Sequence, residues 1–238
     1  MISNFFHAAF YNPIYNILVS LVAVLPGGEV ALAVVIVTIF IRVILLPFTL
    51  AAARTQRAMR TLEPKLKELK ELHKGDKEKE ALATLELYKT ERVNPFASIL
   101  TLFVQIPVLL ALYWVFRYEP FTTLDLARLY SFTPIPHTIS LVFLGISVAG
   151  KSIVLAVLAG IAQYAQATLA LAGSPAPASG AAAQDFQRVL AMQMRYVFPV
   201  LIAVICYTTS SAVALYFLTT NIIGALQELY VRRKYAKV

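Results

Sequence analysis

A long apolar segment that contains a single charged residue most constrains how this chain can fold. Residues 30–50 form a run of about 21 residues in which Arg42 is the only charge. Since a helix needs roughly 20 residues to cross the hydrocarbon core of a bilayer, this run predicts a membrane span. Arg42 lies eight residues before Leu50, about 12 Å along a helix. A charge near a span centre costs about 2.5–3.5 kcal/mol even on lenient scales.

Two environments could accommodate Arg42. Its long side chain could extend to the nearer membrane interface, as arginine side chains near helix ends do. At about 12 Å of depth that reach is strained. A hydrated cavity inside the protein is therefore the interpretation we favour, because charged groups within spans usually face water-filled or functional sites.

The composition identifies the class of protein. The chain has 238 residues, of which 59% are hydrophobic and 14% charged, whereas a soluble domain carries about 25% charged residues. We therefore expect an integral membrane protein of one compact domain. Cys206 is the only cysteine, so an intrachain disulfide is excluded.

Further apolar runs predict the remaining spans, and the result is an all-α protein with five transmembrane helices. These spans are expected at about 96–116, 152–171, 195–209 and 212–230. Thr208–Ser211 is the only polar break in the last apolar region, so the final turn is placed there. Before the first span, Ile14–Leu25 is apolar but only 12 residues long. This stretch predicts an interfacial helix lying along the membrane, within an extracytoplasmic N-terminal segment, 1–28.

A strongly charged segment, 51–94, separates the first two spans and holds 11 of the 21 Lys and Arg residues. Leucines spaced three and four apart predict an amphipathic helix over Glu63–His73, and a second stripe predicts a helix that ends before Asn94. We expect a cytoplasmic helical hairpin, because basic residues concentrate in cytoplasmic loops. The loop 172–194 and the basic C-terminal end are also expected in the cytoplasm. The predicted core domain covers residues 29–235, and residues 236–238 form the tail.

Polar side chains on several spans could share one groove with the arginine. Each could also simply bond a neighbouring helix, which is a common role for Ser, Thr and Gln in membranes. The candidate groove residues are Thr38, Arg42, Ser98, Thr101, Gln105, Gln163, Tyr216, Thr220 and Asn221.

Neither catalysis nor a metal site is indicated. The three histidines are His7, His73 and His137, and all lie outside the proposed spans, so an intramembrane Ser–His pair has no base. The sequence contains no His-Glu-x-x-His motif or cysteine pair, which are common metal-binding patterns. We expect no enzyme activity and no cofactor. Carboxylates are scarce in the spans, which disfavours a proton-coupled pump.

Four short motifs, in order along the chain, resemble those of the YidC-type membrane protein insertases of the oxidase-assembly superfamily. The resemblance covers about residues 10–235, although the turn at Thr208–Ala212 lacks the Pro or Gly usual in the family. The motifs are Thr38–Pro47 with its arginine, Leu87–Lys89 with Val93–Pro95, Gln105–Val108, and Leu215–Tyr216 with Asn221 and Gln227.

The resemblance implies a five-helix bundle in the bacterial inner membrane, with the N-terminus outside and the C-terminus in the cytoplasm. It implies a positively charged hydrophilic groove, open to cytoplasm and lipid, that receives newly made membrane proteins and releases them into the bilayer. The implied partners are these clients and membrane lipids, with the ribosome and a Sec-type translocon as further candidates and no direct DNA binding. An anion-selective channel or small-solute transporter, and an assembly scaffold for a membrane complex, remain the alternative functions.

Overall fold

The computed structural model describes residues 5–91, 107–108, 110–116, 121, 123–171, 189 and 191–235. The described residues are mostly helical, which confirms the predicted all-α class. The only paired strands among them, β1 (Val142–Phe143) and β2 (Ile146–Ser147), form a short antiparallel hairpin. Four helical segments are long and apolar enough to cross a membrane: His7–Val24, Val30–Ala52, Ile153–Leu171 and Ser211–Arg233.

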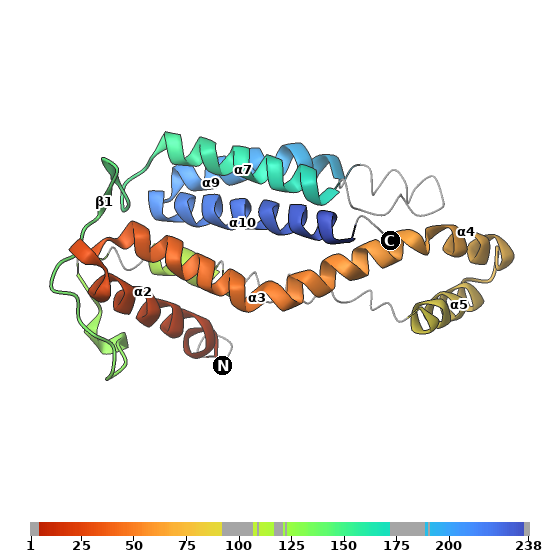
Figure 1. Ribbon diagram of the computed structural model, residues 1–238, viewed down its shortest axis with the longest axis horizontal. Coiled ribbons are helices and arrows are strands. Elements are labelled where there is room, and N and C mark those ends of the chain that lie inside the picture. The colour runs from red at the N-terminus through yellow and green to blue at the C-terminus, as the bar shows by residue number, and fades with distance from the viewer. Residues whose placement is uncertain are drawn as a thin grey trace.

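The N-terminal helix is longer than the sequence suggests. A π-helical turn, η1 (His7–Tyr11), continues directly into α2 (Asn12–Val24), whereas the prediction began the helix near Ile14. Aromatic packing supports the extension, because the Phe6 and His7 rings lie 4.9 and 6.2 Å from the Trp114 ring. Figure 1 shows α2 alongside the first half of α3, against which it packs. At this length a helix could span, so length no longer supports the interfacial position, which stays a prediction.

The first predicted span is the start of a much longer helix. Helix α3 (Val30–Thr61) has 32 residues and continues beyond Leu50 into the segment assigned to the hairpin. The change in charge after residue 50 marks a change of environment, but Ala51–Ala53 and the residues after them are good helix formers, so the helix does not end. Figure 1 shows α3 bent about halfway along. Pro47, inside this helix, removes a backbone donor and explains the bend.

The charged segment then forms a helical hairpin, as predicted. Helix α4 (Glu63–Leu72) packs against α5 (Lys77–Thr90). Gly75, at φ +104°, supplies the left-handed residue of the turn. The Asp76 side chain caps α5 by accepting a hydrogen bond from the Lys79 N–H at 3.1 Å. An exposed ion pair between Lys65 and Glu91 links the two helices.

Only part of the predicted span 96–116 lies among the described residues. Residues 107–108 and 110–116 are helical, and Val108, Ala111, Leu112 and Val115 are buried in the core. Residues 96–106 lie outside the described residues.

The last three helices overlap the ranges of the remaining predicted spans, although Gln193–Thr208 is shorter than the helices long enough to cross a membrane. Helix α7 (Ile153–Leu171) occupies the expected range 152–171, and η4 (Gln193–Val197) leads into α9 (Phe198–Thr208). Helix α10 (Ser211–Tyr235) follows after a turn at Thr209 and Ser210, where the sequence placed it. Most of the loop 172–194 and the tail 236–238 lie outside the described residues.

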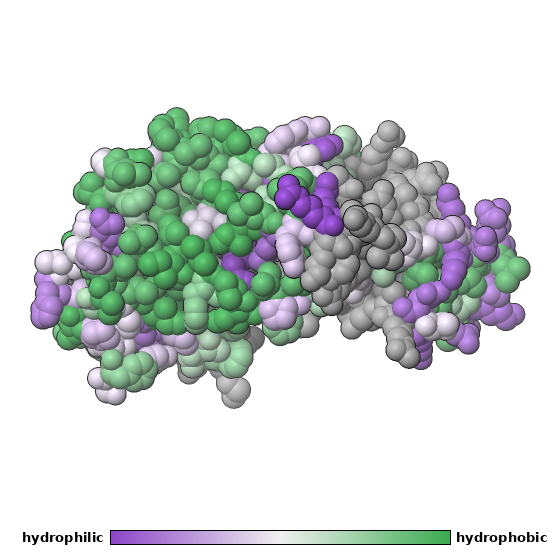
Figure 2. All heavy atoms as spheres, in the orientation of Figure 1, coloured by the Kyte–Doolittle hydropathy of each residue, from purple (hydrophilic) through white to green (hydrophobic). Residues whose placement is uncertain are grey.

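Helix α10 is central to the bundle. It packs against α7 and α9 on one side and α3 on another, and Figure 1 shows it between them. The end of α10 and the α4–α5 hairpin lie toward the same end of the molecule (Figure 1). In Figure 2, hydrophobic residues cover most of the visible bundle, and hydrophilic residues gather on the hairpin. This distribution fits a bundle surrounded by lipid with a hairpin in water.

At the end opposite the hairpin, a loop that contains η3 (Leu126–Arg128) is tied to α2 through Asn16. The Asn16 amide donates to the carbonyl oxygens of Arg128 at 3.0 Å and Asn12 at 2.8 Å. Its oxygen accepts from the Tyr130 N–H and the Thr133 hydroxyl, each at 2.7 Å. Four hydrogen bonds therefore satisfy this buried side chain and hold the loop over the bundle.

A backbone contact attaches the same loop to the turn between α2 and α3. That turn is η2 (Pro26–Gly28). The Ser140 N–H donates to the Gly28 oxygen at 2.8 Å, and the Val30 N–H donates to the Ser140 oxygen at 3.1 Å. Ser211 likewise donates to the Gly150 oxygen through its backbone N–H at 2.7 Å, which connects the loop to the start of α10. The loop thus joins α2, α3 and α10 at this end.

Candidate functional site

Arg42 lies on α3, between buried and exposed faces. Its side chain is half-buried, and its Nε atom is buried with no hydrogen-bond partner among the described residues. The neighbouring Ile39, Val43 and Ile44 are exposed apolar residues, as expected for a helix in contact with lipid. The guanidinium therefore occupies the boundary between the bundle interior and its lipid-facing surface.

Tyr216, on α10, lies near Arg42. The tyrosine side chain is 3% exposed. Helices α3 and α10 pack directly together, and this packing brings together a residue of the first predicted span and one of the last. The structure thus joins two residues that lie far apart in the sequence.

Two further candidates on α10 are buried, and each has one buried polar atom without a hydrogen-bond partner among the described residues. Thr220 is 6% exposed and Asn221 is 4% exposed. Neither the Thr220 hydroxyl oxygen nor the Asn221 amide nitrogen has a hydrogen-bond partner among the described residues. Leaving a buried polar group unpaired costs about 1–3 kcal/mol. Polar atoms in this state can bind water or a polar ligand group.

Thr38 is buried and hydrogen-bonded within its own helix. Its side chain is 1% exposed, and its hydroxyl donates to the Val34 carbonyl oxygen at 2.6 Å. This intrahelical bond satisfies the donor without any ligand. The place of Thr38 in a groove stays a prediction.

Gln163 is half-buried on α7, while Gln166, one turn later, packs against α10. The Gln166 side chain lies so close to Gly224 that an added Cβ there would be 3.2 Å from Gln166 Cγ. The absence of a side chain at Gly224 therefore lets the two helices approach. Gln166 was not among the predicted groove residues, although its spacing from Gln163 puts both on neighbouring positions of one face.

Three predicted groove residues, Ser98, Thr101 and Gln105, lie outside the described residues. Their place in the site stays a prediction. Among the candidates that are described, Arg42, Tyr216, Thr220 and Asn221 come from two helices in contact, and Gln163 from a third helix packed on α10.

Tyr216 also connects this polar region to an apolar cavity. The cavity has a volume of about 490 Å³ and lies between residues 110–116, α9 and α10. Leu110, Phe198 and Leu201 line it together with Tyr216. Tyr216 therefore lies both near Arg42 and in the wall of this apolar cavity.

The described residues include no group of three or more His, Cys, Asp or Glu side chains that could hold a metal ion. The site as described offers a cation and neutral hydrogen-bonding groups. Such groups bind anionic or polar moieties.

Comparison with known proteins gives consistent matches along the chain. The model of the family described as "60Kd inner membrane protein" matches residues 22–237. The membrane protein insertase YidC of Fusobacterium nucleatum is 30% identical over 227 residues, which cover 93% of this chain and 98% of that protein.

Two relatives of the same printed name are much longer. The protein from Francisella philomiragia is 31% identical over 208 residues, covering 87% of this chain and 33% of that protein. The protein from Methylobacillus flagellatus is 30% identical over 228 residues, covering 93% and 35%. The chain thus spans nearly all of the Fusobacterium relative and about one third of the other two.

Proposed function

Because the chain belongs to the 60Kd inner membrane protein family, we propose that it is a membrane protein insertase of the YidC type. In this proposal, client transmembrane segments enter a hydrophilic, positively charged groove that is open to the cytoplasm and to lipid. They then leave the groove for the bilayer. No bond is made or broken, so the activity needs neither a catalytic residue nor a cofactor.

The observation that carries the proposal is the state of Arg42. Its Nε atom is buried without a hydrogen-bond partner among the described residues, beside a lipid-facing surface. A cation in such a place is costly unless water or an anionic group accompanies it. Thr220 and Asn221 on the packed helix α10 have polar atoms in the same state. These residues would together stabilise a hydrated, polar segment within the membrane.

The groove would lower the barrier for the polar part of a client. An acidic residue that crosses the hydrocarbon core alone meets a penalty of about 2.5–3.5 kcal/mol. Water and the Arg42 charge would shorten the apolar distance that this residue crosses. The client's own apolar helix would then move into lipid, driven by burial of its apolar surface. The cavity beside Tyr216 offers that helix an apolar contact on the way.

The proposed orientation follows the distribution of charge. The hairpin end and the end of α10 would face the cytoplasm, and the N-terminal segment would lie outside. The α4–α5 hairpin, whose leucines Leu72, Leu82 and Leu85 are exposed, would be the first element to meet clients. Membrane lipids are the second partner in this proposal, and the ribosome and a Sec-type translocon are further candidates.

Complementation of a strain depleted of its own insertase tests the proposal. We expect Arg42→Ala to reduce insertion of a client with an acidic outer tail by about tenfold or more, equivalent to roughly 1.4 kcal/mol or more of the penalty that a charge meets in the core. A client whose tail lacks acidic residues should be affected less. Arg42→Lys should retain most activity, because it keeps the positive charge.

Lys151→Ala is the matched control, because it removes one exposed positive charge at the end of the molecule opposite the hairpin. This variant should insert both clients normally. Equal insertion of the acidic client by wild type and Arg42→Ala would overturn the groove mechanism. Failure of the wild type to support any client, together with Arg42-dependent anion flux in liposomes, would favour the channel instead.

A further inference from the structure

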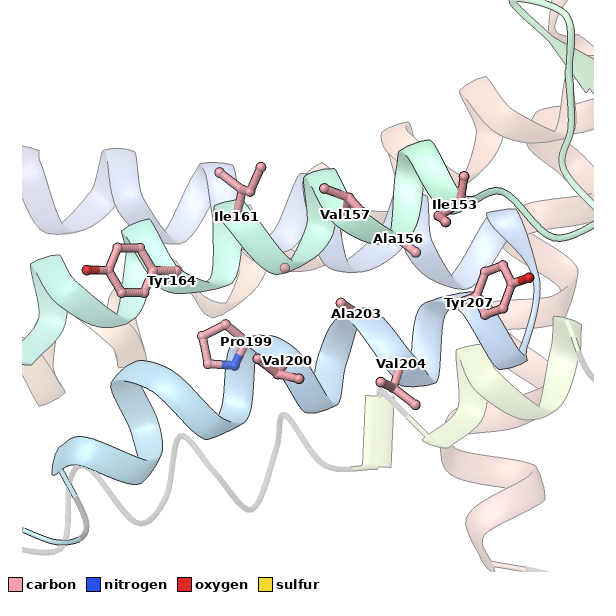
Figure 3. A pocket seen from close by; sticks show the side chains of 11 residues that line it. Ile153, Ala156, Val157, Ile161, Tyr164, Pro199, Val200, Ala203, Val204 and Tyr207 are labelled. Carbon is pink, nitrogen blue, oxygen red and sulfur yellow. The ribbon is translucent and has the colours of Figure 1, made fainter.

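An open apolar groove runs between α7 and α9, on a part of the surface not used by the proposed insertion site. The groove has a volume of about 460 Å³. Its floor is formed where the helices touch: an added Cβ at Gly160 would lie 3.0 Å from the Ala203 Cβ and 3.1 Å from the Pro199 oxygen. Figure 3 shows the lining side chains along both helices, with Tyr164 and Tyr207 toward opposite ends.

The rim of the groove consists of apolar side chains that the rest of the chain leaves uncovered. Val157 is 50% exposed, Val200 is 65% exposed and Val204 is 53% exposed. In a protein of this family these residues face the hydrocarbon core. The groove is therefore in contact with lipid along its length.

A positive charge lies next to one end of the groove. The ring of Tyr164, which lines the groove, is 6.0 Å from the ring of Tyr196, and the Arg195 guanidinium lies 6.0 Å from the same Tyr196 ring. Arg195 Nε also donates to the Thr168 hydroxyl at 3.3 Å. Arg195 thus sits one helical turn beyond the groove, near the C-terminal end of α7.

No carboxylate neutralises Arg195 within the described part of the chain. Arg232, on α10, offers a direct comparison, because it reaches the same end of α7. Arg232 pairs with Glu228 at 3.3 Å and donates to the Leu169 carbonyl oxygen. One of these two arginines is therefore balanced by an acidic side chain, while the other remains available to an anion.

We propose that an anionic phospholipid binds here, with its phosphate at Arg195 and one acyl chain in the groove between α7 and α9. Thr168 and Val157 are eleven residues apart on α7, or about 16 Å along the helix. Half of the hydrocarbon core is about 15 Å thick. An acyl chain that starts at the level of Arg195 therefore reaches the middle of the groove within one leaflet.

The length of the groove and the charge beyond it favour a lipid as the occupant. Ile153 and Tyr164, at the two ends, are eleven positions apart on α7, so the groove is about 16 Å long, close to the thickness of one leaflet's hydrocarbon. Arg195, which no carboxylate pairs among the described residues, favours a lipid with a net negative headgroup. A polypeptide helix on the same surface is the competing occupant, which the crosslinking experiment below distinguishes.

Native mass spectrometry of the full chain in detergent tests the proposal. The purified protein is offered phosphatidylglycerol or phosphatidylcholine of the same acyl composition. We expect wild type to retain more phosphatidylglycerol. In Arg195→Gln, the preference for phosphatidylglycerol over phosphatidylcholine should fall at least about fivefold, which is the effect of removing one basic residue near lipid headgroups. Val157→Trp should lower retention of both lipids, because the indole fills the groove.

Arg233→Gln is the matched control, since it removes an exposed arginine near the same end without touching α7 or the groove in any described contact. It should retain phosphatidylglycerol like the wild type. Unchanged retention of phosphatidylglycerol by Arg195→Gln would overturn the proposal. Unchanged retention of both lipids by Val157→Trp, a substitution at an exposed position, would overturn it as well. A photo-crosslinker at Val200 that captures a polypeptide in place of phospholipid would also overturn it and would identify the groove as a protein contact.

Discussion

At the scale of single residues, buried polar side chains in this protein fall into two kinds. Asn16 is 3% exposed and uses both its amide and its oxygen, in bonds of 2.7–3.0 Å. Thr220 and Asn221 are similarly buried, but each has a polar atom without a partner among the described residues. Fully paired groups stabilise a fold, whereas unpaired ones are costly unless a ligand or water satisfies them. Asn16 therefore stabilises the fold, whereas Thr220 and Asn221, on the helix that packs against α3, are candidates for binding water or a ligand.

Replacing Asn16 should destabilise the whole end of the bundle opposite the hairpin. Asn16→Leu would leave the Tyr130 N–H and the Thr133 hydroxyl without their acceptor. Because each buried unpaired group costs about 1–3 kcal/mol, we expect a loss of at least about 2 kcal/mol in the free energy of unfolding. Chemical denaturation of the detergent-solubilised protein measures this loss.

Asn12→Ala is the control for that measurement. Asn12 is the same residue type one turn earlier on α2, and its side-chain oxygen has no hydrogen-bond partner among the described residues. The substitution should cost less than half of the Asn16→Leu effect. Equal losses for the two variants would contradict a special role for Asn16.

Asp76 provides a pH-dependent prediction at the hairpin. The hydrogen bond from the Lys79 backbone N–H, aided by the Lys79 side chain, holds the pKa of Asp76 below its ordinary value. A carboxylate with a lowered pKa stabilises the folded state above its ordinary pKa, and that stabilisation disappears as the pH falls through the lowered value. We expect the first turn of α5 to lose hydrogen-exchange protection in that acidic range.

The variant Asp76→Asn distinguishes the capping hydrogen bond of this side chain from the titration of its carboxylate. Asparagine also caps helices but does not titrate, so protection of the Lys79 amide should be independent of pH in that variant once intrinsic exchange rates are taken into account. The same pH dependence in Asp76→Asn would assign the effect to another group.

At the scale of elements, the turn between α2 and α3 depends on close approach of two backbones. Gly27 and Gly28 both have positive φ, of 73° and 67°. An added Cβ at Gly28 would lie 1.9 Å from the Thr138 carbonyl oxygen, while the space around Gly27 is open to 4 Å. Glycine at the second position therefore permits the hydrogen bonds that join this turn to the loop at Ser140.

Two alanine substitutions separate conformational strain from this steric overlap. Gly27→Ala should cost about 1–2 kcal/mol, the penalty for a side chain in the left-handed region. Gly28→Ala carries the same penalty and must in addition displace the Thr138 backbone, so we expect a clearly larger loss. Thermal unfolding of both variants in one detergent measures the difference, and equal losses would show that the contact with Thr138 is dispensable.

At the scale of the whole molecule, charge and hydrophobicity divide the protein along its length. Apolar residues such as Phe40, Val43 and Val200 are exposed along the bundle, and the charged hairpin projects beyond it (Figures 1 and 2). The loop of residues 123–150 closes the other end through its bonds to α2, α3 and α10. A bundle closed at one end and polar at the other fits a groove that is accessible from the hairpin side.

The proposed orientation predicts which cysteines a membrane-impermeant maleimide can label in intact cells. Phe132→Cys, at a position 78% exposed on the loop opposite the hairpin, should react from outside. Lys74→Cys, exposed on the hairpin, should react only after the membrane is permeabilised. The native Cys206 is 0% exposed and should stay unlabelled. The reverse labelling pattern would invert the topology.

Composition and contacts between residues close together in the chain account for several features of this protein. The all-α membrane class follows from apolar runs whose length matches a bilayer, and the hairpin follows from its leucine spacing and the turn at Gly75. The turn at Thr209 and Ser210 follows from the only polar break in a long apolar region. Arg42 stands out in the sequence for a similar reason, because a charge within an apolar run of that length is costly in hydrocarbon.

Tertiary structure alone decided the features that depend on contacts between distant residues. Asn16 bonds residues 112 to 117 positions away, so its spacing in the sequence carries no signal. The proximity of Arg42 to Tyr216 and the proximity of Arg195 to the α7–α9 groove both depend on how the chain packs. Helical periodicity assigns a polar residue to a face of its own helix, but only packing determines which neighbour that face meets.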